Sequence, residues 1–97
     1  MTNYENGANF ERRIKKMYES IGWVCIRSAG SRGPIDLICF KGDLEIIFQM
    51  KTYAKWKERK DSLIQLAKTH NRTAYYCWRE DKAPYKIHTE VLNERLN

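Results

Sequence analysis

The sequence has 97 residues, 42% hydrophobic and 31% charged, which fits one globular domain, residues 1–97, with a single modest core. It contains no apolar run long enough to span a bilayer, and its first residues lack the basic start and hydrophobic middle of a signal peptide, so we expect an intracellular, cytoplasmic protein without membrane contact, or one in the host cytoplasm if the gene is viral. The net charge of +6 favours a polyanionic partner, because lysines and arginines that neutralise phosphates release condensed counterions.

The first predicted element is an amphipathic helix from Gly7 to Ile21, followed by Gly22 as a suitable end. Glu11 lies about 100° around the helix from Phe10, at the border of the apolar stripe, so its carboxylate can lean over the edge of the core. The apolar residues that recur at helical spacing are Phe10, Ile14, Met17, Tyr18 and Ile21, and the residues that face away from them are Arg12, Lys15 and Lys16.

Three strands are predicted next. The run "WVCIRSAG" is β-branched and aromatic and stops at Ala29 and Gly30, and "GSRGP" is a loop. The runs "IDLICF" and "LEIIFQMK" follow, joined by Gly42 and Asp43, a pair that suits a two-residue type II′ turn. They predict a hairpin.

The register of this hairpin brings polar residues together. With Gly42 and Asp43 as the turn, counting back along both strands places Asp36 directly across from Gln49, with β-carbons roughly 5 Å apart. Side chains alternate along a strand, so Gln49 and Lys51 share one face with Ile47, and the opposite face carries Ile46, Phe48 and Met50. Asp36, Gln49 and Lys51 therefore converge at the open end of the hairpin, unless a β-bulge shifts the register.

The remaining elements complete an α/β order. Ser62 and Gln65 form a possible capping box for a helix with Leu63, Leu66 and Ala67 on its apolar side. The run "TAYYCWR" predicts a fourth strand, "YKIHT" a short edge strand, and "EVLNERLN" a short final helix. We predict helix, three strands, helix and strand, with a small tail.

The three cysteines are Cys25, Cys39 and Cys77. They are odd in number, lack C-x-x-C spacing, and each lies in a strand-like apolar run. We therefore expect small buried hydrophobic side chains in a reducing compartment, without a zinc or disulfide role.

The polar cluster suggests phosphodiester chemistry. A carboxylate oxygen and an amide oxygen, joined by another acid and by main-chain carbonyls, make an oxygen-rich site suited to Mg²⁺ or Mn²⁺. A nearby ammonium group can orient a water or stabilise charge that develops on a phosphate. This is the chemistry of phosphodiester hydrolysis.

These residues resemble a known family. Asp36 on one strand and "QMK" on the next are similar to the core of the PD-(D/E)XK nuclease superfamily, and so is the element order, which implies a restriction-endonuclease-like fold, a small mixed β-sheet flanked by helices. Within that superfamily, "FERR" in the first helix followed by "RSAGSRGPIDL" resembles the archaeal Holliday junction resolvases and their viral relatives. The resemblance implies a dimeric, magnesium-dependent endonuclease and runs from about Gly7 to Arg79.

The resemblance also implies roles for single residues. Glu11 matches the helix acid that supports the metal, Asp36 a direct metal ligand, and Lys51 the lysine that positions the attacking water. Met50 would add its main-chain carbonyl to the metal, and Ser31 matches a loop serine near the scissile phosphate. The expected contacts to DNA phosphates come from Arg12, Arg27, Arg32, Lys55 and Lys57.

Gln49 departs from the pattern, because Glu or Asp is commonest at its position in the superfamily. An amide still offers one neutral oxygen to a hard cation, but it removes a full negative charge and should weaken metal binding. Some branches of the superfamily do use Gln there. Glu45 lies nearer the turn, and we expect it to be solvated.

Plainer alternatives accompany these assignments. Asp36 and Lys51 could form an ordinary ion pair at a strand end, Glu11 could pair with Lys15, and Tyr53 and Trp56 could pack in the core or a dimer instead of stacking on bases. For the whole protein, the alternatives are a nicking, repair or restriction nuclease of the same superfamily, and a catalytically silent DNA-binding module. Symmetric resolution of a four-way junction implies a homodimer.

Overall fold

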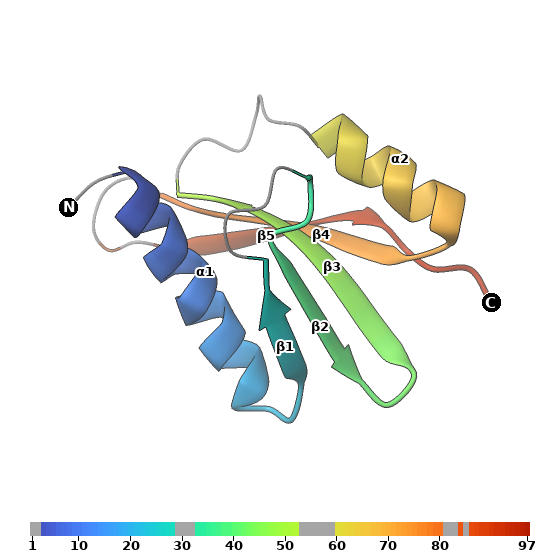
Figure 1. The fold of residues 1–97 in the computed structure, drawn as a ribbon, viewed down its shortest axis with the longest axis horizontal. Coiled ribbons are helices and arrows are strands. Elements are labelled where there is room, and N and C mark those ends of the chain that lie inside the picture. Colours follow the sequence, from blue (N-terminus) through green and yellow to red (C-terminus); the bar gives the residue numbers. More distant parts are fainter. Residues whose placement is uncertain (1–2, 29–32, 53–59, 81–83, 85) are drawn as a thin grey trace.

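A computed structural model describes residues 3–28, 33–52, 60–80, 84 and 86–97. The elements, in chain order, are α1 (Asn3–Glu19), β1 (Val24–Arg27), β2 (Leu37–Lys41), β3 (Leu44–Lys51), α2 (Lys60–His70), β4 (Thr73–Arg79) and β5 (Ile87–Asn93) (Figure 1). No helix in these ranges is both long and apolar enough to cross a membrane.

The helix α1 forms as its apolar spacing predicts, but with different bounds. It begins at Asn3, four residues before the predicted start, and the chain turns away at Gly22, whose φ of 97° suits a residue without a Cβ. Phe10 and Ile14 are buried, whereas Met17 and Ile21 are 47% and 62% exposed. Met17 and Ile21 therefore do not join the core as predicted, whereas Tyr18 of the predicted stripe packs against it.

The five strands form one sheet in the order β1-β2-β3-β4-β5. Three pairings are antiparallel, and β3 pairs with β4 in parallel through the crossover that contains α2. The predicted β2–β3 hairpin is confirmed: Lys41 pairs with Leu44, and Gly42 at the first turn position has the positive φ, 59°, that a type II′ turn requires there.

Both faces of β3 are buried, as its alternating pattern predicts. Ile46, Phe48 and Met50 belong to the core cluster that includes Phe10 and Ile14 of α1. Ile47, on the other face, packs with α2 and β4 in a second cluster, which consists of Ile47, Leu63, Ala67 and Ala74. The two helices thus cover β3 from opposite sides, and β3 is the central strand of the sheet.

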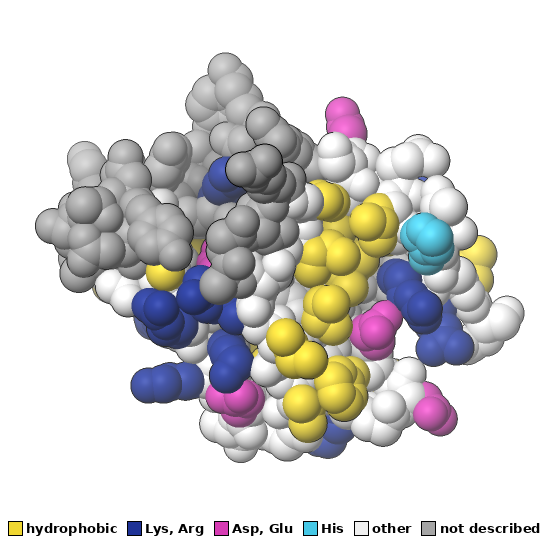
Figure 2. All heavy atoms as spheres, viewed as in Figure 1, with side chains coloured by type: hydrophobic (Ala, Val, Ile, Leu, Met, Phe, Trp, Pro, Cys, Tyr) yellow, Lys and Arg dark blue, Asp and Glu magenta, His cyan; other side chains and the backbone are white. Residues whose placement is uncertain are grey.

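One part of the sheet carries an exposed apolar surface. Val24 pairs with Phe40 and Ile26 with Ile38 across β1 and β2, on the side opposite the α1 cluster. Val24, Ile26 and Phe40 are 52%, 58% and 38% exposed. Hydrophobic side chains gather over β1 and β2 on the surface in Figure 2. We call these four residues the apolar face.

Two predictions near the C-terminus are wrong. The helix α2 begins at Lys60, so Ser62 is an exposed residue inside it and not its cap. The run "EVLNERLN" does not form a helix, because its first residues continue β5, which pairs with β4 through partners such as Tyr76 and Glu90. Pairing with a distant strand outweighs the local helical spacing of Val91, Leu92 and Leu96.

The cysteine prediction is wrong in part. Cys25 and Cys39 face each other directly in the β1–β2 ladder and are joined as a disulfide, with Cα atoms 4.2 Å apart. The sequence spacing of 14 residues gave no sign of this pairing, which arises from the sheet register. Cys77 is the buried free thiol that we expected.

Candidate functional site

The predicted site residues lie on three elements at one end of the sheet. Gln49 and Lys51 end β3, Asp36 immediately precedes β2, and Glu11 lies on α1. The predicted register between β2 and β3 is confirmed from the turn as far as the pair Leu37 and Phe48. It stops there, because the main-chain amide of Asp36 donates to the carbonyl oxygen of Phe48 at 2.7 Å. Asp36 is therefore not the ladder partner of Gln49, contrary to the prediction.

The Asp36 carboxylate is fixed by the main chain of the neighbouring strand. Its Oδ2 accepts a hydrogen bond of 2.8 Å from the amide of Met50. Burial raises the pKa of Asp36 from 3.8 to about 6, the Met50 hydrogen bond lowers it, the negative charge of Glu11 raises it and the positive charge of Lys51 lowers it. Glu11 and Lys51 thus both act electrostatically on Asp36, and a cation at this carboxylate would favour its charged form.

Glu11 has a partner that the sequence did not reveal. Its Oε1 accepts from Nη1 of Arg27 at 2.9 Å, and both side chains are largely buried, with exposures of 17% for Glu11 and 16% for Arg27. Arg27 and Cys25 lie two residues apart on β1, so both side chains point toward α1. Glu11 therefore pairs across elements with Arg27, and Lys15 pairs with Glu19 at 3.0 Å. A half-buried acid on a helix border was the available signal that a cation had to lie nearby.

Gln49 is the polar residue most deeply enclosed near the site. Its side chain is 5% exposed, and its Oε1 is buried without a hydrogen-bond donor in the part of the chain that the structure describes. A buried carbonyl oxygen without a donor loses its hydration and gains nothing in return, which is costly. A hard cation can satisfy this oxygen, so the amide fits the role of a metal ligand.

Together these groups make an oxygen-rich donor set. Asp36 and Glu11 contribute carboxylates and Gln49 a neutral oxygen, and such ligands suit Mg²⁺ or Mn²⁺ more than Zn²⁺. Within the described ranges, no group of three His, Cys, Asp or Glu side chains comes together. The Gln49 amide is thus needed to bring the number of oxygen-donating side chains to three.

Other predicted residues lie elsewhere or outside the described ranges. Glu45 is on β3 near the turn, and its Oε1 pairs with Nε of Arg72 at 3.3 Å. The side chain is only partly exposed, so the prediction that it is solvated holds only in part. Arg12 is exposed on α1. The predicted residues that lie outside the described ranges are Ser31, Arg32, Tyr53, Lys55, Trp56 and Lys57.

The fold and the site define a class. A helix and a β-hairpin bring Glu11, Asp36, Gln49 and Lys51 to one end of a mixed sheet, and this arrangement of elements is that of the PD-(D/E)XK superfamily. Residues 2–96 match the archaeal Holliday junction resolvase (Hjc) family, and the chain belongs to this family.

Individual proteins support this assignment. The chain is 44% identical over 54 residues to the crossover junction endodeoxyribonuclease Hjc of Methanocaldococcus jannaschii. This match covers 56% of the chain and 40% of the relative, so the chain aligns with less than half of that protein. The solved structure of Hjc from Archaeoglobus fulgidus, a Holliday junction resolvase of an archaeal hyperthermophile, is similar with a TM-score of 0.69 at 20% identity, over 94% of the chain and 78% of the other. The similarity of the two structures concerns the fold.

Proposed function

We propose that the protein is an endodeoxyribonuclease that cuts Holliday junctions with a divalent cation, Mg²⁺ or Mn²⁺. The observation that carries this proposal is the buried Oε1 of Gln49 without a donor among the described residues, at the sheet end where Glu11 and Lys51 act on Asp36. Membership of the resolvase family and the crossover junction endodeoxyribonuclease activity of its M. jannaschii member support the choice of substrate. The substrate also implies a location inside a cell, the host cytoplasm if the gene is viral.

The proposed cation would be held by Asp36, Gln49 and Glu11, with the main-chain carbonyl of Met50 as a further ligand. When bound, it would supply positive charge against the phosphate oxygens as they gain negative charge. The chain itself contributes orientation: the Met50 amide holds the Asp36 carboxylate at 2.8 Å, and Arg27 holds Glu11 at 2.9 Å. Side chains fixed in this way need not reorganise during the reaction.

The remaining proposed roles concern water and DNA. The Lys51 ammonium group would position the attacking water, and Ser31 would lie near the scissile phosphate. The proposed contacts to backbone phosphates come from Arg12, Arg27, Arg32, Lys55 and Lys57. Because Arg27 is paired with Glu11, we propose that it mainly supports the acid and contacts phosphate only with the remaining donors of its guanidinium group.

Resolution of a junction requires two cuts, so we propose a homodimer with one site per subunit. The apolar face offers a suitable surface, because Val24, Ile26, Ile38 and Phe40 are adjacent, uncharged and partly exposed. A two-fold axis through such a patch brings it against its own copy. Residues 1–97 would form the single nuclease domain of each subunit.

The test is an incubation of the purified protein with Mg²⁺ or Mn²⁺ on labelled four-way junction, duplex, flap and single-stranded DNA. Symmetric nicking of the junction alone is expected. Cleavage of another substrate instead would favour a different nuclease of the superfamily. No cleavage of any substrate with either ion would overturn the enzyme hypothesis and favour a DNA-binding module in which the neutral Gln49 has replaced an acid.

A further inference from the structure

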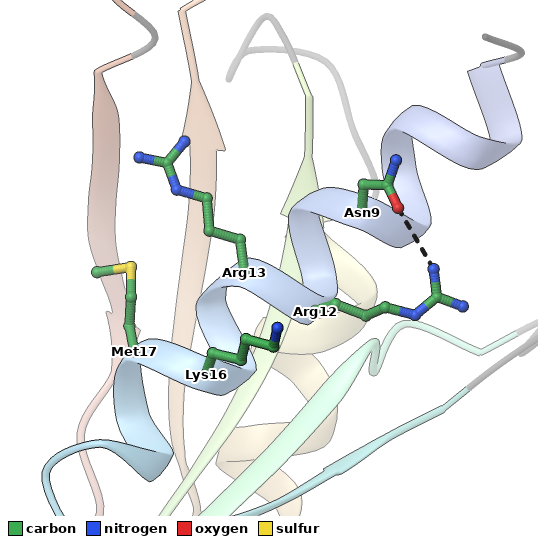
Figure 3. A pocket seen from close by; sticks show the side chains of 5 residues that line it. All are labelled: Asn9, Arg12, Arg13, Lys16 and Met17. Carbon is green, nitrogen blue, oxygen red and sulfur yellow. Dashed lines mark hydrogen bonds between the residues drawn. The ribbon is translucent and has the colours of Figure 1, made fainter.

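A basic surface runs along α1, on the side away from the sheet. Its residues follow one another at alternating intervals of three and one positions along a helical face, and they line a shallow concavity (Figure 3). We call them the α1 stripe: Asn9, Arg12, Arg13, Lys16 and Met17. Lys and Arg side chains gather over α1 on the surface in Figure 2.

Among the residues that the structure describes, no acid is paired with a cation of the stripe. No acid lines the concavity, and no ion pair of Arg12, Arg13 or Lys16 occurs within the described ranges. Arg12 donates a hydrogen bond of 3.4 Å to the amide oxygen of Asn9. The acid nearest in sequence to Lys16 on its C-terminal side, Glu19, is used by Lys15.

Basic residues elsewhere in the molecule show a different pattern. Several pair with glutamates, at distances between 2.9 and 3.4 Å. These pairs are Lys15 with Glu19, Arg27 with Glu11, Lys60 with Glu90, and Arg72 with Glu45. In the α1 stripe, three basic residues without an ion pair in the described ranges lie close together on one helix, whereas other such residues, for example Lys68 and Lys86, are far apart in the sequence.

This concentration opposes folding. Arg12 and Lys16 lie four residues apart and Arg13 and Lys16 three apart, and like charges at these spacings destabilise a helix. A bound polyanion removes the repulsion, so the arrangement fits a surface that meets phosphates.

The position of the stripe decides which phosphates it meets. Glu11, on the same helix, points toward Arg27 and the sheet, whereas Figure 3 shows the long side chains of Arg12 and Arg13 extending to opposite sides of α1. The stripe therefore lies beside the candidate site and not within it. Phosphates bound here would belong to DNA that flanks the bond to be cut.

We propose that the α1 stripe binds the phosphate backbone of a duplex arm, with Arg13 and Lys16 extending the expected contact at Arg12 by one helical turn. This inference rests on the proposed function, because it takes DNA as the ligand. The contacts are to phosphates alone, so they add affinity without base preference.

The experiment measures binding of a labelled four-way junction by anisotropy in EDTA, from about 50 to 300 mM KCl. The double variant Arg13→Gln/Lys16→Gln is compared with Arg13→Lys/Lys16→Arg, which keeps both charges, and with Lys68→Gln/Lys86→Gln, which removes two exposed charges elsewhere. Each lost phosphate contact should reduce the slope of log K against log salt by about 0.9, so the first variant should lose about two from the slope. The other two variants should keep the wild-type slope.

An unchanged slope in Arg13→Gln/Lys16→Gln would overturn the assignment, and so would an equal loss in Lys68→Gln/Lys86→Gln. These outcomes are independent of cleavage, because binding is measured without metal. If the wild type binds junctions with the predicted slope changes but never cuts them, the proposed activity fails and the phosphate surface stands. If the wild type binds no DNA, both fail.

Discussion

The Asp36 carboxylate accepts a hydrogen bond from the main-chain amide of Met50, and this contact of 2.8 Å ties the start of β2 to the end of β3. It holds the central acid of the candidate site by the backbone of the strand that also carries Gln49 and Lys51. The orientation of Asp36 therefore depends on the sheet and not on a mobile side chain.

Replacement of Asp36 by Asn separates this structural role from charge. The variant keeps an oxygen that can accept from Met50, so the fold should remain, but it loses the negative charge needed to hold a cation. We expect junction cleavage to fall by at least ~100-fold while binding in EDTA changes little. The matched control is Asp43→Asn, the same change at the exposed hairpin turn, which should cleave as the wild type does. Cleavage by Asp36→Asn at the rate of the control would remove Asp36 from the metal site.

Gln49→Glu tests whether the buried amide faces a cation. Gln49 is 5% exposed, so the new carboxylate would be buried. Without metal, the midpoint of thermal unfolding should therefore drop at pH 8, because the buried acid must ionise there. With Mg²⁺, the added charge should tighten metal binding on the order of tenfold and restore the midpoint. Calorimetric titration with Mg²⁺ checks the affinity, and Gln65→Glu, at an exposed position of α2, should change neither quantity. Equal Mg²⁺ affinity in Gln49→Glu and the wild type would show that Gln49 is not a ligand.

Arg27→Gln should destabilise the protein through Glu11. The variant leaves the Glu11 carboxylate, 17% exposed, without its cation, and we expect a loss of about 1–3 kcal/mol in the free energy of unfolding, measured by urea denaturation. Arg72→Gln breaks a more exposed pair, with Arg72 47% and Glu45 36% exposed, and should cost less than ~1 kcal/mol. The double variant Glu11→Gln/Arg27→Gln should recover part of the loss. If Arg27→Gln costs no more than Arg72→Gln, the pair does not stabilise the site.

The raised pKa of Asp36 predicts a specific pH dependence of stability in metal-free protein. Because the pKa is about 6 in the folded state against an ordinary 3.8, the folded protein binds the proton more tightly than the unfolded chain does. Protonation of Asp36 therefore stabilises the folded state. This contribution to the free energy of unfolding is complete below pH 3.8 and is lost as the pH rises through about 6. Asp36→Asn cannot titrate, so the stability of the wild type minus that of the variant should fall over this range, and other acids cancel in the difference.

Chemical denaturation at several pH values measures this difference. Mg²⁺ should make the stability difference between wild type and Asp36→Asn fall less with pH, because a cation favours the charged carboxylate. A difference that is constant between pH 4 and 7 would contradict an Asp36 pKa of about 6.

Ile26→Lys tests the apolar face as the dimer surface. Ile26 is 58% exposed on β1, so a lysine can remain solvated in the monomer but would be buried in a dimer that uses this face. We expect at least a tenfold weaker dimer by sedimentation velocity, with an unchanged circular dichroism spectrum. Leu96→Lys, at a position 76% exposed and outside the apolar face, is the control. Unaltered dimerisation in Ile26→Lys would assign the interface to another surface.

The sequence predicted those parts of the fold that depend on local patterns. The periodicity around Phe10 and Ile14 located α1, and the Gly42–Asp43 turn fixed the hairpin register as far as Leu37 and Phe48. The errors lie where a distant partner decides. The predicted edge strand at "YKIHT" is confirmed from Ile87, but β5 continues to Asn93 through residues predicted as helix, because they pair with β4.

The same distinction applies to the site. Local counting brought Asp36 and Gln49 to the same end of the hairpin, but the bond from the Asp36 amide to the Phe48 carbonyl ends the ladder before them. The pairing of Glu11 with Arg27 joins residues 16 positions apart on different elements, so no periodicity reveals it. Cys25 and Cys39 are a similar case, because only the strand register makes them neighbours.

The parallel pairing of β3 with β4 has a consequence for the order of folding. Glu11, Asp36, Gln49 and Lys51 all precede the crossover, on a helix and antiparallel strands, and we expect these elements to form early because their contacts are closer in sequence than those of the parallel pair. Gln49 and Lys51 then pair with Tyr76 and Trp78 only after α2 has carried the chain back across the sheet. The site residues can thus be gathered first and fixed last, so substitutions in α2 or β4 that slow this final docking would delay the appearance of activity without touching a site residue.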